Sequence, residues 1–251
     1  MTLQQLTHLT RTLGEPARDY VIVGEGNTSM RIDEDSFYVK ASGQRMETIT
    51  EAGFVAVRFE PILALFDDPP QTRTELKARM MTARVDQSTE VVPSVETSFH
   101  AMLLHDTGAA FVGHTHPTPV NQLLANNHAQ TFAEKRLFPD HAVLCGPESV
   151  FVPYVDPGLP LAQAIRERVR AYMDKHGAAP HEILMANHGT IALGQSVDEI
   201  LNVTAMSVKA AKIMVGALST GQPNYMSPED VMHIYKRPDE IYRRSRFVSG
   251  E

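Results

Sequence analysis

Residues 109–117 of the 251-residue chain read AAFVGHTHP. The apolar run 109–113 predicts a buried strand that ends at two histidines. On an extended segment alternate side chains point to the same side, so His114 and His116 can aim at one point. Two converging imidazoles form half of a metal site. Histidines at this spacing also occur as ordinary core or surface residues, so the pair needs partners before it indicates a metal.

Two residues elsewhere in the chain can complete such a site. His188 follows the apolar segment 182–186, which predicts a strand, and precedes Gly189, where a backbone can approach closely. Glu96 falls in the first turn of a helix expected over 94–105. Both have ordinary interpretations as well, His188 as a polar loop residue and Glu96 as a carboxylate that caps the helix dipole. Together, three histidines and a carboxylate suit a divalent transition metal, most often zinc.

His100 lies one helical turn beyond Glu96 on the same helix face. It can contact a metal ligand without binding the metal itself, or it can be a histidine of the core. The sequence slightly favours the core histidine.

A second group of polar residues precedes the histidines. Segment 24–29 (GEGNTS) is expected to be a turn-rich loop, and segment 40–43 (KASG) follows an expected hairpin. Glycines beside small polar side chains expose backbone N–H groups that bind phosphate or carboxylate, and Lys40 can add a point charge. Ordinary turns share this composition, Lys40 can equally be a solvated strand residue, and neither segment matches a nucleotide-binding fingerprint. The candidate anion-binding residues are Asn27, Thr28, Lys40, Ser42, Gly43 and Ser94.

Hydrophobic patterning predicts alternating helices and strands. Helices are expected at 3–14, 94–105, 118–127, 161–176 and 196–218, and strands at 21–23, 54–59, 109–113, 150–154 and 182–186, with a hairpin over 30–39. Ser196 and Glu199 form a capping box before the longest helix, and another helix begins near Ser227. With no repeat and no separating linker, we expect a single α/β domain over residues 1–251.

Composition excludes several classes of protein. A net charge of -7 and a pI near 5.9 argue against a basic nucleic-acid-binding face, while leaving small anionic substrates possible. Cys145 is the single cysteine, so no intrachain disulfide can form, and its apolar neighbours predict a small buried side chain. The N-terminus does not read as a signal peptide, and no apolar run approaches membrane-spanning length. We therefore expect a cytoplasmic protein without a membrane partner.

In this order the motifs resemble those of the class II aldolase/adducin family, which contains fuculose-phosphate and rhamnulose-phosphate aldolases. The resemblance covers residues 24–194. Its motifs are Gly26-Asn27-Thr28-Ser29, Ala41-Ser42-Gly43, Pro93-Ser94-Val95-Glu96 with His100, His114-Thr115-His116 and Asn187-His188-Gly189. The resemblance implies a three-layer α/β/α sandwich around a central, largely antiparallel sheet, and a homotetramer with active sites between subunits.

The resemblance also implies roles for individual residues. A zinc ion, or another divalent metal such as Mn²⁺ or Co²⁺, is expected on His114, His116 and His188. Glu96 is then a fourth ligand or the acid/base that leaves the metal when substrate binds. The anionic end of the substrate is expected beside Asn27, Ser42, Gly43 and Ser94.

Two departures from the family pattern alter the expected anion pocket, and two of the family's tyrosines have no clear match. Val95 stands where fuculose-type enzymes carry a second phosphate-holding serine, and Lys40 replaces a threonine. The family's tyrosine from a neighbouring subunit aligns with Pro139, so Asp140 and His141 are the nearby polar substitutes. The family's C-terminal tyrosine has three candidates, Tyr225, Tyr235 and Tyr242.

The activity that the resemblance implies is that of a metal-dependent aldolase, a carbon–carbon lyase. Retro-aldol cleavage of a small ketose or ketose phosphate passes through a metal-stabilised enediolate, and Glu96 transfers the proton. The same intermediate serves a decarboxylase, a dehydratase or an epimerase of sugar acids or sugar phosphates. Glu96 favours the aldolase branch of the family over the epimerase branch, in which the resemblance implies an aspartate at this position. Adducin-type interaction modules keep the fold without the metal site, and the retained ligand set argues against that function.

Overall fold

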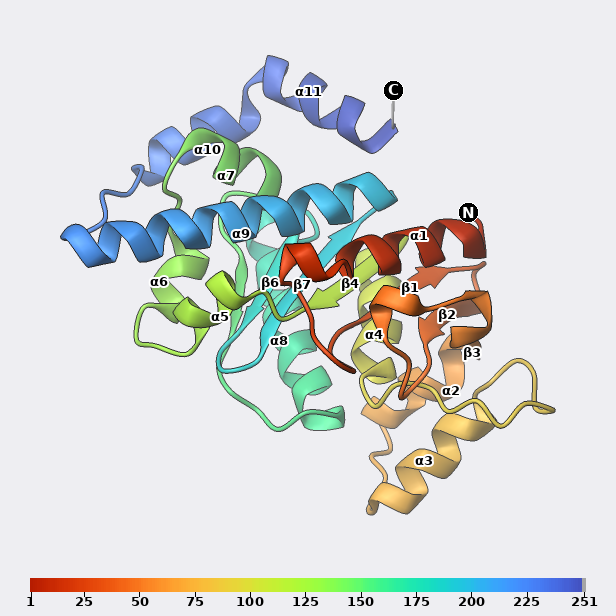
Figure 1. The fold of residues 1–251 in the computed structure, drawn as a ribbon. Coiled ribbons are helices and arrows are strands. Elements are labelled where there is room, and N and C mark those ends of the chain that lie inside the picture. Colours follow the sequence, from red (N-terminus) through yellow and green to blue (C-terminus); the bar gives the residue numbers. More distant parts are fainter. Residues whose placement is uncertain (250–251) are drawn as a thin grey trace. The chain divides into compact units, whose positions relative to one another are not determined.

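The computed structural model describes residues 1–249 as an α/β protein whose strands form a seven-stranded sheet (Figure 1). The strands are β1 (Asn27–Arg31), β2 (Ser36–Lys40), β3 (Phe54–Arg58), β4 (Phe111–Thr115), β5 (Val150–Val152), β6 (Glu182–Met185) and β7 (Gly189–Gly194). The α-helices are α1 (Leu3–Leu13), α2 (Phe59–Leu63), α3 (Arg73–Thr82), α4 (Thr97–Thr107), α5 (Thr118–Leu124), α6 (Ala129–Glu134), α7 (Pro139–Cys145), α8 (Leu159–His176), α9 (Val197–Thr220), α10 (Pro228–Lys236) and α11 (Pro238–Ser249). Short 3₁₀ turns lie at Pro16–Arg18, Met46–Thr48, Glu51–Gly53 and Ala64–Phe66.

The chain divides into two compact units. Unit 1 contains residues 1–113 and 155–167, and unit 2 contains residues 114–154 and 168–251. Strand β4 crosses the boundary. The single domain expected from the sequence stays a prediction, because compactness alone does not decide whether the units fold separately.

Unit 1 is built on the strand order β3-β2-β1-β4, with antiparallel pairs between β1 and β2 and between β2 and β3. Successive side chains of a strand point to opposite faces. On β1, the Thr28 hydroxyl lies 2.5 Å from Thr10 of α1, and the next side chain, Ser29, lies 2.6 Å from the ring of His100 on α4. Helices α1 and α4 therefore cover opposite faces of this part of the sheet, which is the three-layer arrangement expected.

Unit 2 is built on the order β4-β7-β6-β5, in which β6 and β7 are antiparallel and β5 and β6 are parallel. Helix α9 packs on β7 and against α5 and α7. Among the described residues, α9 is long and apolar enough to cross a membrane by length and composition, contrary to expectation. Its side chains Ile200, Val203 and Met214 are buried in unit 2, so it is a core helix.

The start of the sheet differs from the sequence prediction. Val21–Val23 is not a strand, because Val23 adopts a positive φ of 54° and its side chain is 71% exposed. The strand instead covers Asn27–Arg31, where a loop was expected. Polar side chains there find partners on both faces of the sheet, so the usual apolar signal is missing. Helix α4 also begins later than predicted, at Thr97, with Glu96 as its N-cap residue.

The N-terminus of α9 is capped by a side chain, as the sequence predicts. Ser196 Oγ accepts a hydrogen bond from the backbone N–H of Glu199 at 3.2 Å. The Glu199 carboxylate reaches back one residue further than a capping box requires, to the N–H of Gln195 at 2.7 Å. The cap thus ties the turn after β7 to the first turn of α9.

We predict that Ser196→Ala lowers the free energy of unfolding by about 1 kcal/mol, because the N–H of Glu199 loses its partner. Urea unfolding followed by circular dichroism measures the change. The control is Ser219→Ala at the exposed other end of α9, where a change within about 0.5 kcal/mol is expected. Equal losses in both variants would show that the Ser196 cap contributes nothing specific.

Candidate active site

Three histidines converge in unit 2. His114 lies in β4, His116 follows the strand, and His188 lies in the turn between β6 and β7. Their ring centroids are separated by 4.7 Å (His114 and His116), 5.0 Å (His114 and His188) and 5.2 Å (His116 and His188). One nitrogen from each ring lies within 4.8 Å of the others, so the three form a group that could hold a metal ion. We call these three residues the histidine cluster.

The backbone sets the orientation of His114. Its Nδ1 lies 2.9 Å from the carbonyl oxygen of Thr190, and because a carbonyl only accepts, Nδ1 carries the proton. The lone pair is therefore on Nε2, which lies 3.0 Å from Nε2 of His116. Zinc–nitrogen bonds of about 2.0–2.1 Å place two tetrahedral ligands about 3.3 Å apart, close to this spacing. A carbonyl bonded to the opposite ring nitrogen is the usual support of a metal-binding histidine.

The conformation of the turn that carries His188 depends on the residues around it. Asn187 has a positive φ of 55°, which asparagine tolerates better than most residues. Asn121 donates a hydrogen bond to the His188 carbonyl at 3.0 Å. A Cβ atom on Gly189 would lie 2.6 Å from the Thr115 carbonyl oxygen and 2.7 Å from the His116 ring. The close backbone approach expected at Gly189 is therefore present.

A second set of buried polar side chains gathers in unit 1. The Asn27 amide donates to Glu96 Oε2 at 2.6 Å and to Ser94 Oγ at 3.2 Å. His100 Nε2 donates to the Asn27 carbonyl oxygen, which leaves Nδ1 to accept from the Ser29 hydroxyl at 2.6 Å. Three of these bonds form a chain from Ser29 through His100 and Asn27 to Glu96, and the fourth joins Asn27 to Ser94. We call this set the amide cluster.

His100 is neutral within this chain. Burial lowers its pKa to about 3; the Glu96 carboxylate opposes this shift and Lys40 adds to it. The ring is fully buried and stacks on Phe99 at 4.6 Å. His100 is thus a core histidine, as favoured from the sequence, that also fixes the orientation of the Asn27 amide. Its spacing from Glu96 was the signal for this second role.

Glu96 does not act as a helix cap through its side chain. It is the N-cap residue of α4, yet its carboxylate makes no capping hydrogen bond. The side chain is 8% exposed and accepts from Asn27 instead. The carboxylate lies at the N-terminus of α4, where the helix dipole favours it, but it makes no capping hydrogen bond.

Lys40 is buried rather than solvated. Its side chain is 3% exposed, and Nζ donates to the Gln44 carbonyl at 2.6 Å. Burial lowers the pKa of Lys40, and the charge of Glu96 partly opposes that shift. Ser42 and Gly43 are exposed in the turn after β2, where Gly43 has a φ of 79°.

Thr28 is the candidate anion-binding residue that the structure separates from the rest. Its side chain points to the α1 face of the sheet and bonds Thr10. Asn27, on the preceding position of β1, points to the opposite face with Ser94 and Glu96. Successive side chains of a strand point to opposite faces, which separates Thr28 from Asn27. The sequence did not predict this separation, because a loop was expected at these residues.

The two substitutes for the family's neighbouring-subunit tyrosine lie in different environments. Asp140 on α7 is 45% exposed and pairs with Arg243 at 2.5 Å. His141 is fully buried, with Phe132 and Phe138 at ring distances of 5.9 Å and 5.7 Å. A side chain in the interior of its own subunit cannot contact a neighbouring copy, so the expected role of His141 is wrong.

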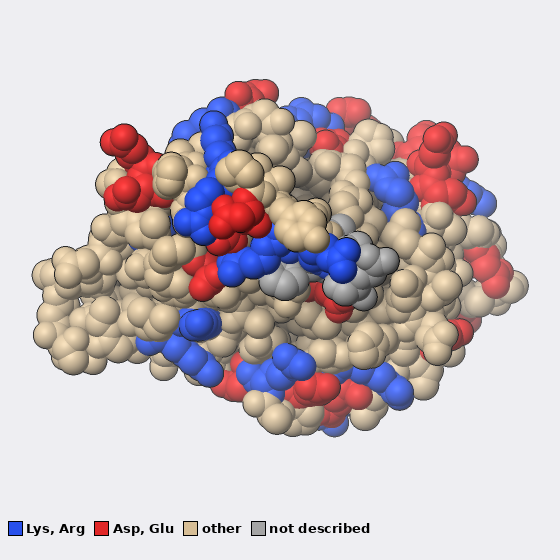
Figure 2. Space-filling model, turned by 90° about the horizontal axis from the view of Figure 1, so that it is seen from above, with Lys and Arg blue, Asp and Glu red and all other residues tan. Residues whose placement is uncertain are grey.

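Figure 2 shows acidic and basic side chains intermixed on one face of the molecule.

Among the three C-terminal tyrosine candidates, Tyr235 contacts both a histidine and an arginine. Its hydroxyl lies 3.2 Å from Nε2 of His181, whose other ring nitrogen lies 3.6 Å from the Glu199 carboxylate. The guanidinium of Arg244 lies 4.4 Å from the centre of its ring. Burial raises the pKa of Tyr235, so the phenol stays protonated.

Comparisons with known proteins agree with the fold. Methylthioribulose-1-phosphate dehydratase of Geobacillus kaustophilus (strain HTA426) is 25% identical over 188 residues, which cover 73% of this chain and 77% of that protein. The uncharacterised oxidoreductase YuxG of Bacillus subtilis (strain 168) is 27% identical over 199 residues, 75% of this chain. The match spans only 26% of the length of YuxG, so this chain corresponds to a part of that larger protein.

A solved structure of an L-fuculose 1-phosphate aldolase superposes with a TM-score of 0.69 at 18% identity, covering 93% of this chain and 94% of the other. The fold expected from the motifs is therefore confirmed. Residues 4–215 also match the family described as Class II Aldolase and Adducin N-terminal domain. This match covers most of the sequence, and the chain belongs to the class II aldolase and adducin family.

Proposed function

We propose that this chain is a divalent-metal-dependent lyase that cleaves a carbon–carbon bond in a small, anionic ketose or ketose phosphate. The observation that carries the proposal is the convergence of three histidine nitrogens within 4.8 Å. The family and the fuculose-phosphate aldolase with the same fold support the reaction class. The resemblance also supports a cytoplasmic homotetramer as part of the proposal.

The donor set of the histidine cluster fits zinc, and Mn²⁺ or Co²⁺ would find the same ligands. His114 offers the lone pair of Nε2, because its Nδ1–H is held by the Thr190 carbonyl. His116 and His188 are only partly buried, so part of each side chain is in contact with solvent. A divalent metal bound there would act as a Lewis acid toward the substrate carbonyl.

Glu96 is the proposed proton-transfer group. Its carboxylate is nearly buried and accepts one strong hydrogen bond from the Asn27 amide. The amide keeps its N–H groups toward Glu96 because neutral His100 donates to the amide oxygen. In the proposed reaction, Glu96 takes a proton from the substrate hydroxyl as the carbon–carbon bond breaks and later returns a proton to carbon. His100 is a positioning residue in this scheme.

Lys40 is the proposed anchor for the substrate's anionic end. Its ammonium is largely desolvated, so an anion beside it would restore a favourable charge interaction. Both N–H groups of the Asn27 amide already bond Glu96 and Ser94, and the Ser42 backbone N–H bonds the Val92 carbonyl oxygen at 2.9 Å. The Ser94 hydroxyl accepts from Asn27 and from the Glu96 N–H, so its own hydrogen can be donated, and the Ser42 hydroxyl lies in an exposed turn. Val95 is 62% exposed and cannot replace the missing serine hydroxyl.

A second candidate function is dehydration of a ketose phosphate. It is favoured by the similarity to methylthioribulose-1-phosphate dehydratase, which extends over 77% of that protein. Decarboxylation and epimerisation use related chemistry and remain alternatives. Mass analysis of the products separates these reactions: cleavage gives two carbonyl fragments, dehydration removes one water, decarboxylation releases CO₂ and epimerisation leaves the mass unchanged.

We predict that Glu96→Gln lowers kcat by roughly 10²–10⁴-fold, since an amide cannot accept the proton. Metal content should stay at the wild-type level, because the three histidines remain. Steady-state kinetics with metal analysis on the same sample measures both. Glu90→Gln, at an exposed carboxylate of the same unit, should retain normal kcat. Normal turnover in metal-loaded Glu96→Gln would refute the proton-transfer role.

We expect Lys40→Met to raise KM by roughly 10- to 100-fold, the effect of losing a charge-assisted bond of about 1.5–3 kcal/mol. The metal content should not change. Lys77→Met, at an exposed position on α3, is the control and should leave KM unaltered. An unchanged KM in Lys40→Met, or a neutral sugar as the best substrate, would show that Lys40 does not bind an anion.

Gly189→Ala should lower the metal content per chain, because the new Cβ forces His116 or the Thr115 backbone to move. Elemental analysis after dialysis measures the loss. Gly216→Ala is the matched control, since a Cβ there meets no atom within 4 Å. Full metal retention in Gly189→Ala would argue that the histidine cluster is not the binding site.

A further inference from the structure

Helix α7 and strand β6 bring together a second set of metal-binding side chains in unit 2. His141 and Cys145 are four residues apart on α7, so they lie on one face of the helix. Glu182 lies on β6, and one ligand atom from each of the three lies within 4.8 Å of the others. All three side chains have zero exposed surface. We propose that this set, the buried cluster, is a second metal site for zinc or a similar thiolate-binding divalent cation, and it shares no residue with the histidine cluster.

His141 gives the strongest indication that the buried cluster lacks a partner. Among the residues that the structure describes, neither ring nitrogen has a hydrogen-bond partner. Buried polar side chains are nearly always hydrogen-bonded, so two orphaned nitrogens on one ring require an explanation. The neighbouring rings of Phe132 and Phe138 offer no acceptor. A metal bound to one nitrogen would satisfy an otherwise unpaired lone pair.

Cys145 and Glu182 supply the sulfur and oxygen of the donor set. Among the described residues, the Cys145 thiol makes a long contact, 3.8 Å, to the Val203 carbonyl oxygen. Glu182 Oε2 accepts a hydrogen bond from Ser149 at 2.6 Å, and Ser149 in turn accepts from Arg136 at 2.9 Å. Metal-binding carboxylates are commonly held in this way by a further hydrogen bond. One sulfur, one nitrogen and one oxygen leave a fourth tetrahedral position open, a set that suits zinc or cobalt.

Two of the three side chains can supply negative charge to a divalent ion. Binding breaks the Cys145 S–H bond as the metal–sulfur bond forms, and the proton leaves to solvent. The thiolate and the Glu182 carboxylate then neutralise a divalent ion. His141 contributes a neutral ring, in line with a pKa that burial lowers well below its usual value. The buried Arg136 leaves the loaded site with one net positive charge, and its guanidinium donates hydrogen bonds to the Ser149 hydroxyl and to the backbone carbonyls of Gly146 and Cys145.

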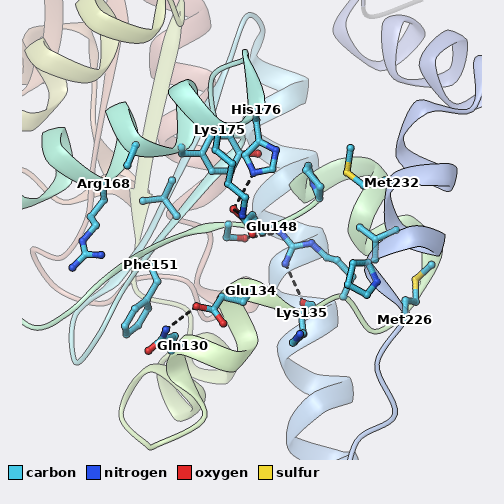
Figure 3. A pocket seen from close by; sticks show the side chains of 18 residues that line it. Gln130, Glu134, Lys135, Glu148, Phe151, Arg168, Lys175, His176, Met226 and Met232 are labelled. Carbon is cyan, nitrogen blue, oxygen red and sulfur yellow. Dashed lines mark hydrogen bonds and ion pairs between the residues drawn. The ribbon is translucent and has the colours of Figure 1, made fainter.

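Unit 2 also contains a cavity of about 590 Å³ (Figure 3). Arg136 and Ser149 belong to its lining, and Ser149 bonds Glu182 directly. In the same cavity, Glu148 pairs with Lys175 at 2.6 Å and with His176 at 2.9 Å (Figure 3). Ser149 thus connects the lining of this cavity to the Glu182 carboxylate through one hydrogen bond.

Cobalt substitution tests the proposal without reference to activity. Cys145 is the only cysteine of the chain, so an intense near-ultraviolet thiolate-to-cobalt absorption band can arise only there. The full-length protein is produced in medium with Co²⁺ in excess, so that the ion is present as the chain folds. We expect this band in the wild type, with its intensity proportional to bound cobalt. Cys145→Ser should lose the band and one cobalt ion per chain, whereas His116→Ala should keep the band.

Absence of the band in the cobalt-grown wild type would overturn the proposal, whether or not any variant folds. A band that persists in Cys145→Ser would overturn it as well. The proposed function fails separately. A wild type that shows the band but holds a single cobalt ion, which His116→Ala does not remove, would support the buried cluster and contradict the histidine cluster.

Discussion

The close approach of the β6–β7 turn to the end of β4 is the constraint on which the candidate metal site depends. Gly189 allows this approach, because any side chain there would collide with the Thr115 carbonyl and the His116 ring. The Thr190 carbonyl, one residue later, then fixes the ring of His114. The same short stretch thus positions His188, makes room for His116 and sets the tautomer of His114. The backbone thus positions the side chains of the candidate site.

In the amide cluster of unit 1, hydrogen bonds between side chains orient the functional groups. Burial keeps His100 neutral, so the ring can donate from one nitrogen and accept at the other. This fixes which end of the Asn27 amide faces the Glu96 carboxylate. A charged His100 would donate from both nitrogens, so the Ser29 hydroxyl would accept instead of donate. The proton on Nε2 of His100 thus orients the Asn27 amide toward the proposed proton-transfer group.

The sequence predicted the parts of the site that follow from local pattern. The spacing of His114 and His116, the strand before His188 and the glycine after it were all readable, because strand periodicity and close backbone approach leave local signals. Strand β1 was not predicted, because its side chains Asn27, Thr28 and Ser29 are polar on both faces of the sheet. The burial of Cys145 was predicted and is confirmed. The buried cluster could not be predicted, because Glu182 is remote in sequence from α7 and no motif joins them.

The central claim is that His114, His116 and His188 bind one divalent metal, and anomalous diffraction at the zinc absorption edge tests it most directly. Crystals of the zinc-loaded protein should show an anomalous peak with three imidazole nitrogens at about 2.0–2.1 Å. His114 should bind through Nε2, with Nδ1 still bonded to the Thr190 carbonyl. An anomalous map without a peak among these rings, in crystals that contain zinc, would contradict the account.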